Sequence, residues 1–251
     1  MRQAVESFTM TEQSLNGKTV LITGAARRIG RIFALACAGA GADIVIHHGH
    51  SDKDAESLRN EIKGLGRQAW IFKADLSDSS QAQRLIPLVN ESTALHGLVN
   101  SAAIFESLTL ESTSFEDWER HLTVNLTTPF LLSQAFARQA GENARIVNIL
   151  DWRALRPGAD HFPYTVSKSA LAAMTKSLAI ALAPRIIVNG LAFGAILPPS
   201  DGNANPEIIK NVPLKRWAQK GEIEQALIFL LTCPAYITGE IIHVDGGRHL
   251  V

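Results

Sequence analysis

Two residues in the second half of the chain have the types and the spacing needed to move a proton. Tyr164 and Lys168 are four residues apart in a segment with helical periodicity, so both side chains leave the helix from one face. A phenol titrates near a pKa of about 10, and a neighbouring ammonium stabilises the phenolate, so we expect Lys168 to lower the pKa of Tyr164. An ordinary helix with a buried ring and a solvated lysine has the same spacing, so the interpretation depends on the residues around the pair.

Asp151 lies thirteen positions before Tyr164, directly after a predicted strand. A carboxyl group there can orient the phenol, or take up and pass on protons itself. Asp151, Tyr164 and Lys168 are therefore a candidate catalytic group. The sequence has no Gly-x-Ser-x-Gly turn, no Gly-Lys-Ser or Gly-Lys-Thr phosphate loop and no Cys/His cluster with zinc spacing.

A glycine-containing turn, Thr23-Gly-Ala-Ala-Arg-Arg-Ile-Gly30, follows the first predicted strand and opens the first predicted helix. Such a turn brings backbone amides and a helix N-terminus to a pyrophosphate, although a tight turn that uses glycine only for backbone shape looks the same. The residues that we expect to contact a dinucleotide from this turn are Gly24, Arg27, Arg28, Ile29 and Gly30.

The second predicted strand favours NADPH over NADH. It runs Asp43-Ile-Val-Ile-His-His48 and lacks the terminal acidic residue that accepts the ribose hydroxyls of NAD. Arg27, His50 and Ser51 can supply the charge and hydroxyl that a 2′-phosphate needs, or can be ordinary solvated loop residues. His47, His48 and His50 are expected to line a nucleotide edge rather than to bind a metal. The ends of the next two strands add four expected cofactor contacts, Asp75, Leu76, Asn100 and Ala102.

Short apolar runs alternate with helix-length segments along the chain, which predicts an α/β fold with a doubly wound parallel sheet and helices on both faces. The expected strands are 19–23, 43–47, 69–73, 97–100, 145–150, 186–189 and 241–244, and the expected helices are 29–39, 52–65, 79–93, 114–140, 163–183 and 221–231. Ligands of such sheets bind beyond the carboxyl ends of the strands. A segment rich in Pro, Gly and Asn, at about 194–212, is expected to be the substrate loop.

The composition predicts one globular domain, 16–251, preceded by a flexible tail, 1–15, in which Met10 is an alternative start. Twenty-four basic and 24 acidic residues balance, so nucleic acid and anionic membranes are unexpected partners. Cys37 and Cys233 lie in apolar segments and are expected to be inert thiols in a reducing compartment. The absence of a signal core and of a run of roughly 20 apolar residues favours a cytoplasmic protein.

Eight motifs in order resemble the short-chain dehydrogenase/reductase family. They are Thr23-Gly24 with Gly30, Asp75-Leu76, Asn100-Ser-Ala-Ala103, Asn125, Asp151, Tyr164-x-x-x-Lys168, Val188-Asn189-Gly190 and Val244-Asp-Gly-Gly247. The resemblance implies a Rossmann-like fold, a nicotinamide cofactor and a homotetramer built through the helices around Asn125 and Tyr164. It also implies that Asn125 holds a water of the proton relay, that Lys168 binds the nicotinamide ribose and that Tyr164 is the acid.

Four departures from the common family pattern resemble the pteridine reductases, including the dihydromonapterin reductases. Arg28 replaces a glycine, Asp151 replaces the catalytic serine, Phe105 has the place of a substrate-stacking phenylalanine, and the chain ends Asp245-Gly-Gly-Arg-His-Leu250. The resemblance implies a pterin bound by Arg28, Phe105, Asp151 and Tyr164, and reduced with NADPH.

Two other functions stay open from the sequence. One is a generic carbonyl reductase acting on a ketone, a sugar or a 3-oxoacyl thioester, and the other is a nucleotide sensor, which the intact Tyr164/Lys168 pair disfavours. Phe193-Gly194 stands where the family has Pro-Gly, so Phe193 either lines the substrate pocket or packs beneath it.

Overall fold

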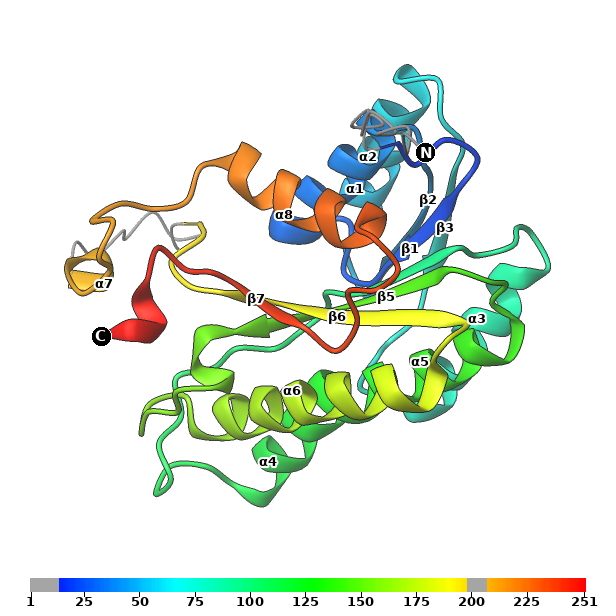
Figure 1. Cartoon of the computed structure of the whole chain (residues 1–251). Coiled ribbons are helices and arrows are strands. Elements are labelled where there is room, and N and C mark those ends of the chain that lie inside the picture. Colours follow the sequence, from blue (N-terminus) through cyan, green and yellow to red (C-terminus); the bar gives the residue numbers. More distant parts are fainter. Residues whose placement is uncertain (1–13, 198–206) are drawn as a thin grey trace, which may run out of the picture.

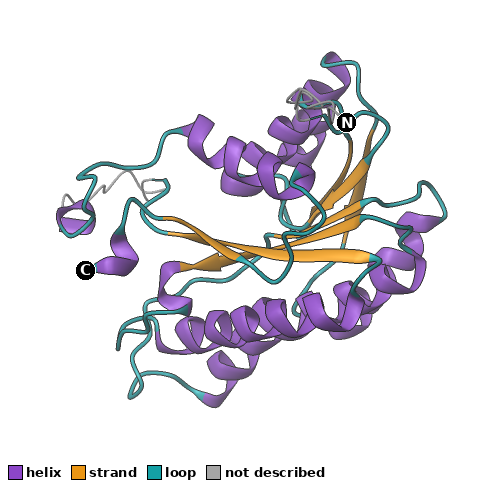
Figure 2. Cartoon of the chain, viewed as in Figure 1, coloured by secondary structure: helices purple, strands orange, loops and turns teal. Residues whose placement is uncertain are grey.

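Seven parallel strands form one sheet in the order β3-β2-β1-β4-β5-β6-β7 (Figure 1). The computed structural model describes residues 14–197 and 207–251. The strands are β1 (Thr19–Ile22), β2 (Asp43–His48), β3 (Ala69–Lys73), β4 (Gly97–Asn100), β5 (Ala144–Asp151), β6 (Ile186–Phe193) and β7 (Ile241–Val244). Because parallel neighbours need crossover connections, helices lie on both faces (Figure 2).

The helices divide into two layers. One face carries α1 (Arg28–Gly39), α2 (Asp52–Gly64) and α8 (Lys220–Thr232), and the other carries α3 (Ser79–Asn90), α4 (Phe115–Leu122), α5 (Thr128–Gln139) and α6 (Phe162–Leu182). The short helix α7 (Glu207–Lys210) and the 3-10 turns η2 (Trp152–Ala154) and η3 (Arg248–Leu250) lie near the carboxyl ends of β5, β6 and β7 (Figure 1). A π-helix, η1 (Thr123–Thr127), joins α4 to α5.

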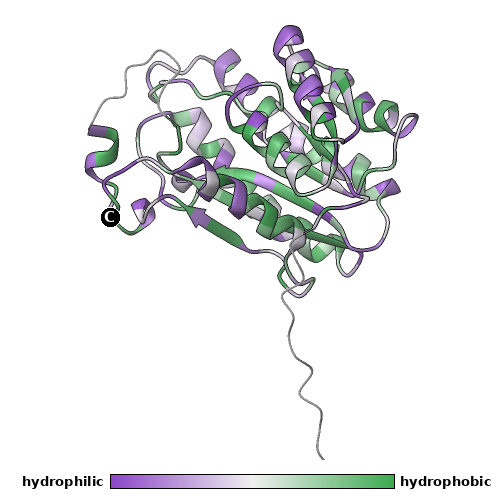
Figure 3. Cartoon of the chain, turned by 90° about the horizontal axis from the view of Figure 1, so that it is seen from above, coloured by the Kyte–Doolittle hydropathy of each residue, from purple (hydrophilic) through white to green (hydrophobic). Residues whose placement is uncertain are grey.

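The core consists of two main clusters, one under each helix layer. Phe33, Ile44 and Leu227 belong to the cluster under α1, α2 and α8, and Phe136 and Leu98 belong to the cluster under α3, α5 and α6. The strands of the sheet are accordingly hydrophobic along much of their length, whereas the outer helices carry polar faces (Figure 3). This double burial keeps the sheet rigid.

The predicted doubly wound α/β fold is confirmed, and three of the seven strands have the expected bounds. β5 and β6 are longer than expected, because their extra residues pair with each other up to Asp151 and Phe193. The expected helix 114–140 is divided by η1. Leu15 was expected in the flexible tail, but it is buried in the core and its N–H donates to the carbonyl of Ala40. Residues 1–13, which include Met10 and most of the expected tail, and residues 198–206 of the expected loop lie outside the described residues.

Candidate active site

The three residues of the candidate catalytic group meet at the carboxyl edge of the sheet. Asp151 ends β5, and Tyr164 and Lys168 lie in the first two turns of α6. The Tyr164 hydroxyl donates to Oδ2 of Asp151 over 3.2 Å. Lys168 Nζ donates to the carbonyl of Ile149 over 2.7 Å and lies 5.7 Å from the centroid of the Tyr164 ring. The helical spacing of four therefore places both side chains against the end of β5.

Burial dominates the ionisation of Tyr164. The ring is 7% exposed, and burial, followed by the charge of Asp151 and the hydrogen bond to it, raises the pKa of Tyr164 well above 10. The expectation that Lys168 lowers this pKa is wrong for this structure. The reason is that loss of hydration and a neighbouring carboxylate both oppose a phenolate. Tyr164 is therefore a neutral phenol that donates a hydrogen bond.

The pKa of Asp151 is raised and the pKa of Lys168 is lowered, so the two values lie closer together than in water. Burial raises the pKa of Asp151, although the Arg153 backbone N–H, the Arg153 guanidinium and Lys168 oppose that shift. Burial also lowers the pKa of Lys168 to about 8, against the charge of Asp151. The carboxyl thus holds its proton to a higher pH than an exposed aspartate does, which suits a group that gives a proton to a substrate.

Arg153 is a site residue that the sequence analysis missed. Its backbone N–H donates to Oδ1 of Asp151 over 2.9 Å, and its guanidinium lies 3.6 Å from the same oxygen and 2.7 Å from Oδ2 of Asp160. The signal was its place two residues after a carboxylate that ends a strand, which is the spacing of a side chain that accepts a backbone N–H.

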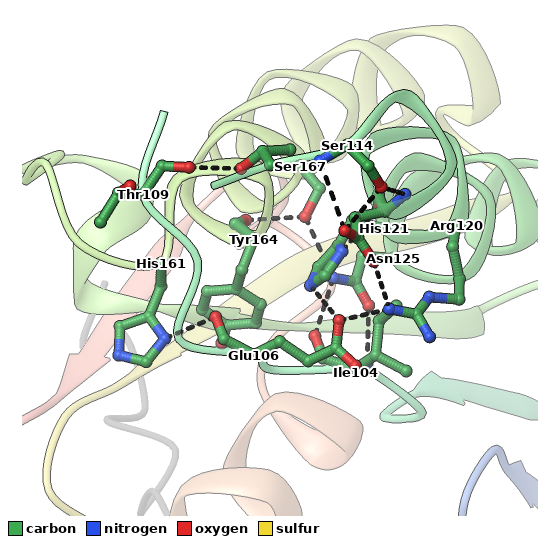
Figure 4. A network of polar contacts seen from close by, with 12 residues as sticks. Ile104, Glu106, Thr109, Ser114, Arg120, His121, Asn125, His161, Tyr164 and Ser167 are labelled. Carbon is green, nitrogen blue, oxygen red and sulfur yellow. Dashed lines mark hydrogen bonds and ion pairs between the residues drawn. The ribbon is translucent and has the colours of Figure 1, made fainter. Parts of the chain in front are cut away.

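Asn125 holds the loop that carries Phe105. It is fully buried in the π-helix η1, a kind of bulge often found at functional sites. Its amide accepts from the N–H of Ile104 over 2.9 Å and donates to the carbonyl of Ile104 and to Ser167 Oγ, each over 3.1 Å (Figure 4). The side chain is thus fully engaged, and the water that the resemblance assigns to Asn125 stays a prediction.

Phe105 lies beside Tyr164, as the stacking hypothesis requires. Its ring meets the Tyr164 ring edge to face, with centroids 4.7 Å apart, and it stacks on His161 at 4.0 Å and 19°. Despite these contacts Phe105 is 54% exposed. His161, which the sequence analysis missed, donates from Nδ1 to the carbonyl of Glu106 over 2.8 Å, because a carbonyl only accepts (Figure 4). His161 and Tyr164 thus both contact the Phe105 ring, and part of the ring stays exposed.

The glycine turn is tight, with Gly30 packed against the backbone of Gly24. Gly24 has a φ of 66°, and a Cβ on Gly30 would lie 2.2 Å from the carbonyl oxygen of Gly24. Thr23 Oγ1 accepts from the N–H groups of Ser101 and Ala102, each over 2.9 Å, and so ties this turn to the end of β4. The backbone can therefore approach a pyrophosphate closely at the start of α1.

His47 supports the glycine turn from below. Its Nδ1 accepts from the N–H of Gly24 over 3.1 Å, so its Nε2–H donates to the carbonyl of Ala74 over 3.1 Å. Burial lowers the pKa of His47 to about 4, so the ring is neutral near pH 7. His47 and His48 are buried, whereas His50 is exposed beyond the end of β2.

The two arginines of the turn differ in backbone conformation. Arg27 is extended, and its Nε donates to Oδ2 of Asp54 over 3.0 Å. Arg28 has a φ of 49°, the left-handed region that favours glycine. Ile29 follows on the first turn of α1, and Ser51 precedes α2 without a side-chain capping bond. A 2′-phosphate near Arg27 would share that guanidinium with Asp54.

The other expected cofactor residues lie at the strand ends, but several side chains point inward. Asn100 donates to Oδ1 of Asn148 over 2.8 Å in a buried polar network, and Leu76 packs in the core under α3. The Asp75 carboxylate accepts from the N–H and hydroxyl of Ser77, which lowers the pKa of Asp75. A bound nucleotide would therefore meet the backbone of Asn100 and Leu76. Their cofactor role stays a prediction.

Phe193 packs beneath the site rather than lining it. It is 4% exposed and stacks on Phe33 of α1 at 6.0 Å. Cys37 and Cys233 are free and buried, as expected of core thiols. A cavity of about 430 Å³ lies at the opposite, amino edge of the sheet, around Lys18 and Arg145, and contains no residue of the candidate site.

Neither a membrane-spanning helix nor a metal-binding group is found in residues 14–197 and 207–251. None of the helices there is both long and apolar enough to cross a bilayer. No group of three His, Cys, Asp or Glu side chains in these ranges is arranged to hold a metal ion.

Comparison with known proteins agrees with this geometry. The family profile described as enoyl-(acyl carrier protein) reductase matches residues 24–249. The 3-oxoacyl-(acyl-carrier-protein) reductase of Synechocystis sp. is 32% identical over 241 residues, which cover 93% of this chain and 98% of the relative.

Two solved structures resemble the chain over nearly its whole length. Blue fluorescent protein from a metagenomic library, in complex with NADPH, has a TM-score of 0.89 at 32% identity and covers 94% of this chain and 99% of its own. FolM alternative dihydrofolate reductase 1 from Brucella canis, complexed with NADP, has a TM-score of 0.86 at 33% identity, covering 94% and 95%. The chain therefore belongs to the short-chain dehydrogenase/reductase family.

Proposed function

We propose that this protein is an NADPH-dependent oxidoreductase that reduces dihydropterins to their tetrahydro forms. The observation that carries the proposal is the carboxyl of Asp151, 3.2 Å from the Tyr164 hydroxyl, with the Phe105 ring against Tyr164. A flat heteroaromatic ring can stack on the open surface of Phe105 and present a ring nitrogen to this pair. The similarity to an alternative dihydrofolate reductase supports the same substrate class.

The chain's backbone fits a dinucleotide. The interior of the turn between Gly24 and Gly30 has no room for a Cβ, as close approach to a pyrophosphate requires. Gly24, Arg28, Ile29 and Gly30 would hold the phosphates, and Lys168 would hold the nicotinamide ribose. NADPH supplies a hydride when it is bound. NADP or NADPH is present in the two solved structures described above.

Asp151 and Tyr164 carry out the proton transfer of the reaction. Reduction of a dihydropterin adds hydride at C6 and a proton at N5. Burial raises the pKa of Asp151, so its carboxyl is protonated to a higher pH than an exposed aspartate and is a stronger acid than the neutral phenol. Asp151 gives the proton, and Tyr164 keeps its carboxyl oriented through their hydrogen bond.

A second function, reduction of a ketone or 3-oxoacyl thioester, is favoured by the named relatives, which include 3-oxoacyl-(acyl-carrier-protein) reductases. The Tyr164/Lys168 pair would serve that reaction equally well. Asp151 argues against it, because the family resemblance implies a hydroxyl at this position in the common members of the family and this chain has a carboxyl there instead. The homotetramer and the cytoplasmic location belong to the proposal as predictions from the sequence.

The deciding experiment compares NADPH oxidation with dihydropterins and with ketones in the wild type and in Asp151→Ser. We expect the wild type to reduce dihydropterins, and Asp151→Ser to lose about 100-fold or more in kcat for them, because a hydroxyl cannot supply the acidic proton. Asp160→Ser is the matched control, since Asp160 binds Arg153 but does not touch Tyr164. Turnover confined to ketones would reverse the ranking of the two functions. Equal or better use of NADH than of NADPH would contradict the assignment of NADPH as the cofactor.

A further inference from the structure

The C-terminal turn of the chain is built to hold one arginine in a fixed place. The Asp245 carboxylate is buried, and it accepts from the N–H of Gly247 over 2.9 Å and from the N–H and Nδ1 of His249, each over 2.8 Å. Gly247 has a φ of 86°, where its missing Cβ avoids Pro213. Arg248 is thus presented from a turn that is hydrogen-bonded on both sides.

This turn packs on the residues that directly follow the candidate acid. The Arg248 guanidinium lies 4.9 Å from the ring centroid of Trp152, the neighbour of Asp151 in sequence. Arg153 lies 4.8 Å from the same ring. Arg156 Nη1 donates to the carbonyl of Arg248 over 3.5 Å. Two guanidinium groups therefore lie on Trp152 at the edge of the active site, and that of Arg156 lies against the backbone of Arg248. We call Arg156 and Arg248 the C-terminal arginine pair.

The three arginines near Trp152 differ in whether a carboxylate neutralises their charge. Arg153 is paired with Asp151 and Asp160. No carboxylate of residues 14–197 and 207–251 forms an ion pair with Arg156 or Arg248. Arg248 is only half-buried and Arg156 is exposed, so both can meet a ligand. The site thus has a positive rim next to a catalytic carboxyl.

The proposed reaction indicates which part of the substrate lies at this positive rim. The side chain of a pterin is attached at C6, the carbon that accepts the hydride and that adjoins the protonated N5. That side chain must therefore leave the site next to Asp151 and Tyr164, where Trp152 and the C-terminal arginine pair lie. A carboxylate at its end would meet guanidinium donors, which bind carboxylates strongly.

We infer that Arg248, assisted by Arg156, binds the carboxylates of the substrate's side chain, and that the substrate is a dihydrofolate rather than a pterin with a neutral side chain. This inference rests on the proposed pterin reduction. Arg248 acts on specificity, since it touches the substrate far from the reacting atoms.

The test compares kcat/KM for 7,8-dihydrofolate, which carries two carboxylates, with that for 7,8-dihydrobiopterin, which carries none. In Arg248→Met we expect the ratio of the two values to fall about tenfold, through KM for dihydrofolate, because the carboxylates are bound alike in the ground and transition states. Arg248→Lys keeps the charge without the guanidinium fork and should fall in between. Arg84→Met, on the exposed face of α3, is the matched control and should leave the ratio unchanged.

A salt series gives a second readout. Added NaCl should raise KM for dihydrofolate in the wild type and have less effect in Arg248→Met, because exposed charges are screened. An unchanged ratio in Arg248→Met, or equal losses for both substrates, would overturn the inference.

Failure of the proposed function gives a different result, since neither pterin would then be reduced by the wild type. In that case, titration of folate into the NADP-bound protein still tests whether Arg248 binds the carboxylates of the ligand. Weaker folate binding in Arg248→Met than in the wild type would support the anion site, and equal binding or no binding would overturn it.

Discussion

At the level of single residues, Asp151 shows that burial can determine a pKa against the effect of neighbouring charges. Tyr164, Asp151 and Lys168 lie in one buried cluster, and for each of them burial is the largest cause of the pKa shift. Each shift disfavours the charged form, as expected where hydration is lost. Burial thus favours the neutral phenol of Tyr164, raises the pH at which the Asp151 carboxyl loses its proton and lowers the pH at which the Lys168 ammonium does.

This shift gives a pH dependence of stability. The pKa of Lys168 is about 8 in the folded protein and about 10.5 in the unfolded chain, so between these values the unfolded chain binds more protons. The free energy of unfolding of the wild type should therefore rise with pH over this window, relative to Lys168→Met, by on the order of 2 kcal/mol. Urea denaturation of both proteins without cofactor at pH 7 and pH 10 measures this, and Lys176→Met on the exposed face of α6 is the control. A difference in the free energy of unfolding between wild type and Lys168→Met that does not change with pH would contradict the lowered pKa of Lys168.

Arg28 gives a second prediction, in which function and stability are opposed. An arginine with a φ of 49° is strained by about 1 kcal/mol, and glycine relieves that strain. Arg28→Gly should therefore raise the free energy of unfolding by up to about 1 kcal/mol, offset in part by the entropy of glycine, while NADPH binding weakens about tenfold through loss of a phosphate contact.

Arg27→Gly is the matched control for stability alone, because Arg27 is extended and has no such strain to relieve. Thermal denaturation and a fluorescence titration with NADPH measure the two quantities. A less stable Arg28→Gly with unchanged NADPH binding would mean that Arg28 has a structural role only.

At the level of elements, the first helix contains two glycines that differ in what surrounds them. A Cβ on Gly30 would lie 2.2 Å from the Gly24 carbonyl oxygen, whereas a Cβ on Gly39 would meet nothing within 4 Å. Gly30→Ala should cost on the order of 2 kcal/mol and weaken NADPH binding, because the turn must open. Gly39→Ala in the same helix should be neutral or stabilising by up to about 1 kcal/mol. Chemical denaturation and NADPH titration of both variants test this, and equal effects would contradict the close approach.

The elements were predictable from sequence to the extent that local patterns determine them. Apolar runs located all seven strands, because strands of a sheet covered on both faces have few polar residues to interrupt the pattern. The π-helix at Thr123–Thr127 was not predictable, because one extra residue in a helical turn leaves the apolar periodicity nearly unchanged. The length of β6 was missed because its pairing with β5 continues past the first apolar residues.

Which candidate side chains lie together was predictable from the sequence, but their ionisation was not. Motif spacing placed Asp151, Tyr164 and Phe105 together, and the structure brings them into contact. Burial, which decides the pKa of Tyr164, depends on the whole fold and is invisible in a local motif. His161 was missed for the same reason, since its stacking on Phe105 joins two segments that are distant in sequence.

At the level of the whole molecule, the two helix layers differ in what their outer surfaces offer. A shallow groove runs between α5 and α6, lined by Phe130, Leu178 and Leu182 together with Ser133, Gln134, Ala137, Arg138 and Arg185. Phe130 is 42% exposed there. An exposed aromatic residue beside partly buried leucines is typical of a surface that another chain covers. This is the helix pair through which the family resemblance implies a homotetramer.

We therefore expect the wild type to behave in solution as an assembly of four 27.2 kDa chains, and Phe130→Glu to dissociate it. A carboxylate in the middle of an apolar interface would be buried without a partner, which costs several kcal/mol at each symmetry-related contact. Leu65→Glu is the matched control, since Leu65 is 53% exposed beside α2 in the other layer and should leave the assembly intact. Light scattering after size-exclusion chromatography measures the mass. A wild-type monomer, or a tetramer that survives Phe130→Glu, would show that the groove between α5 and α6 is not the interface.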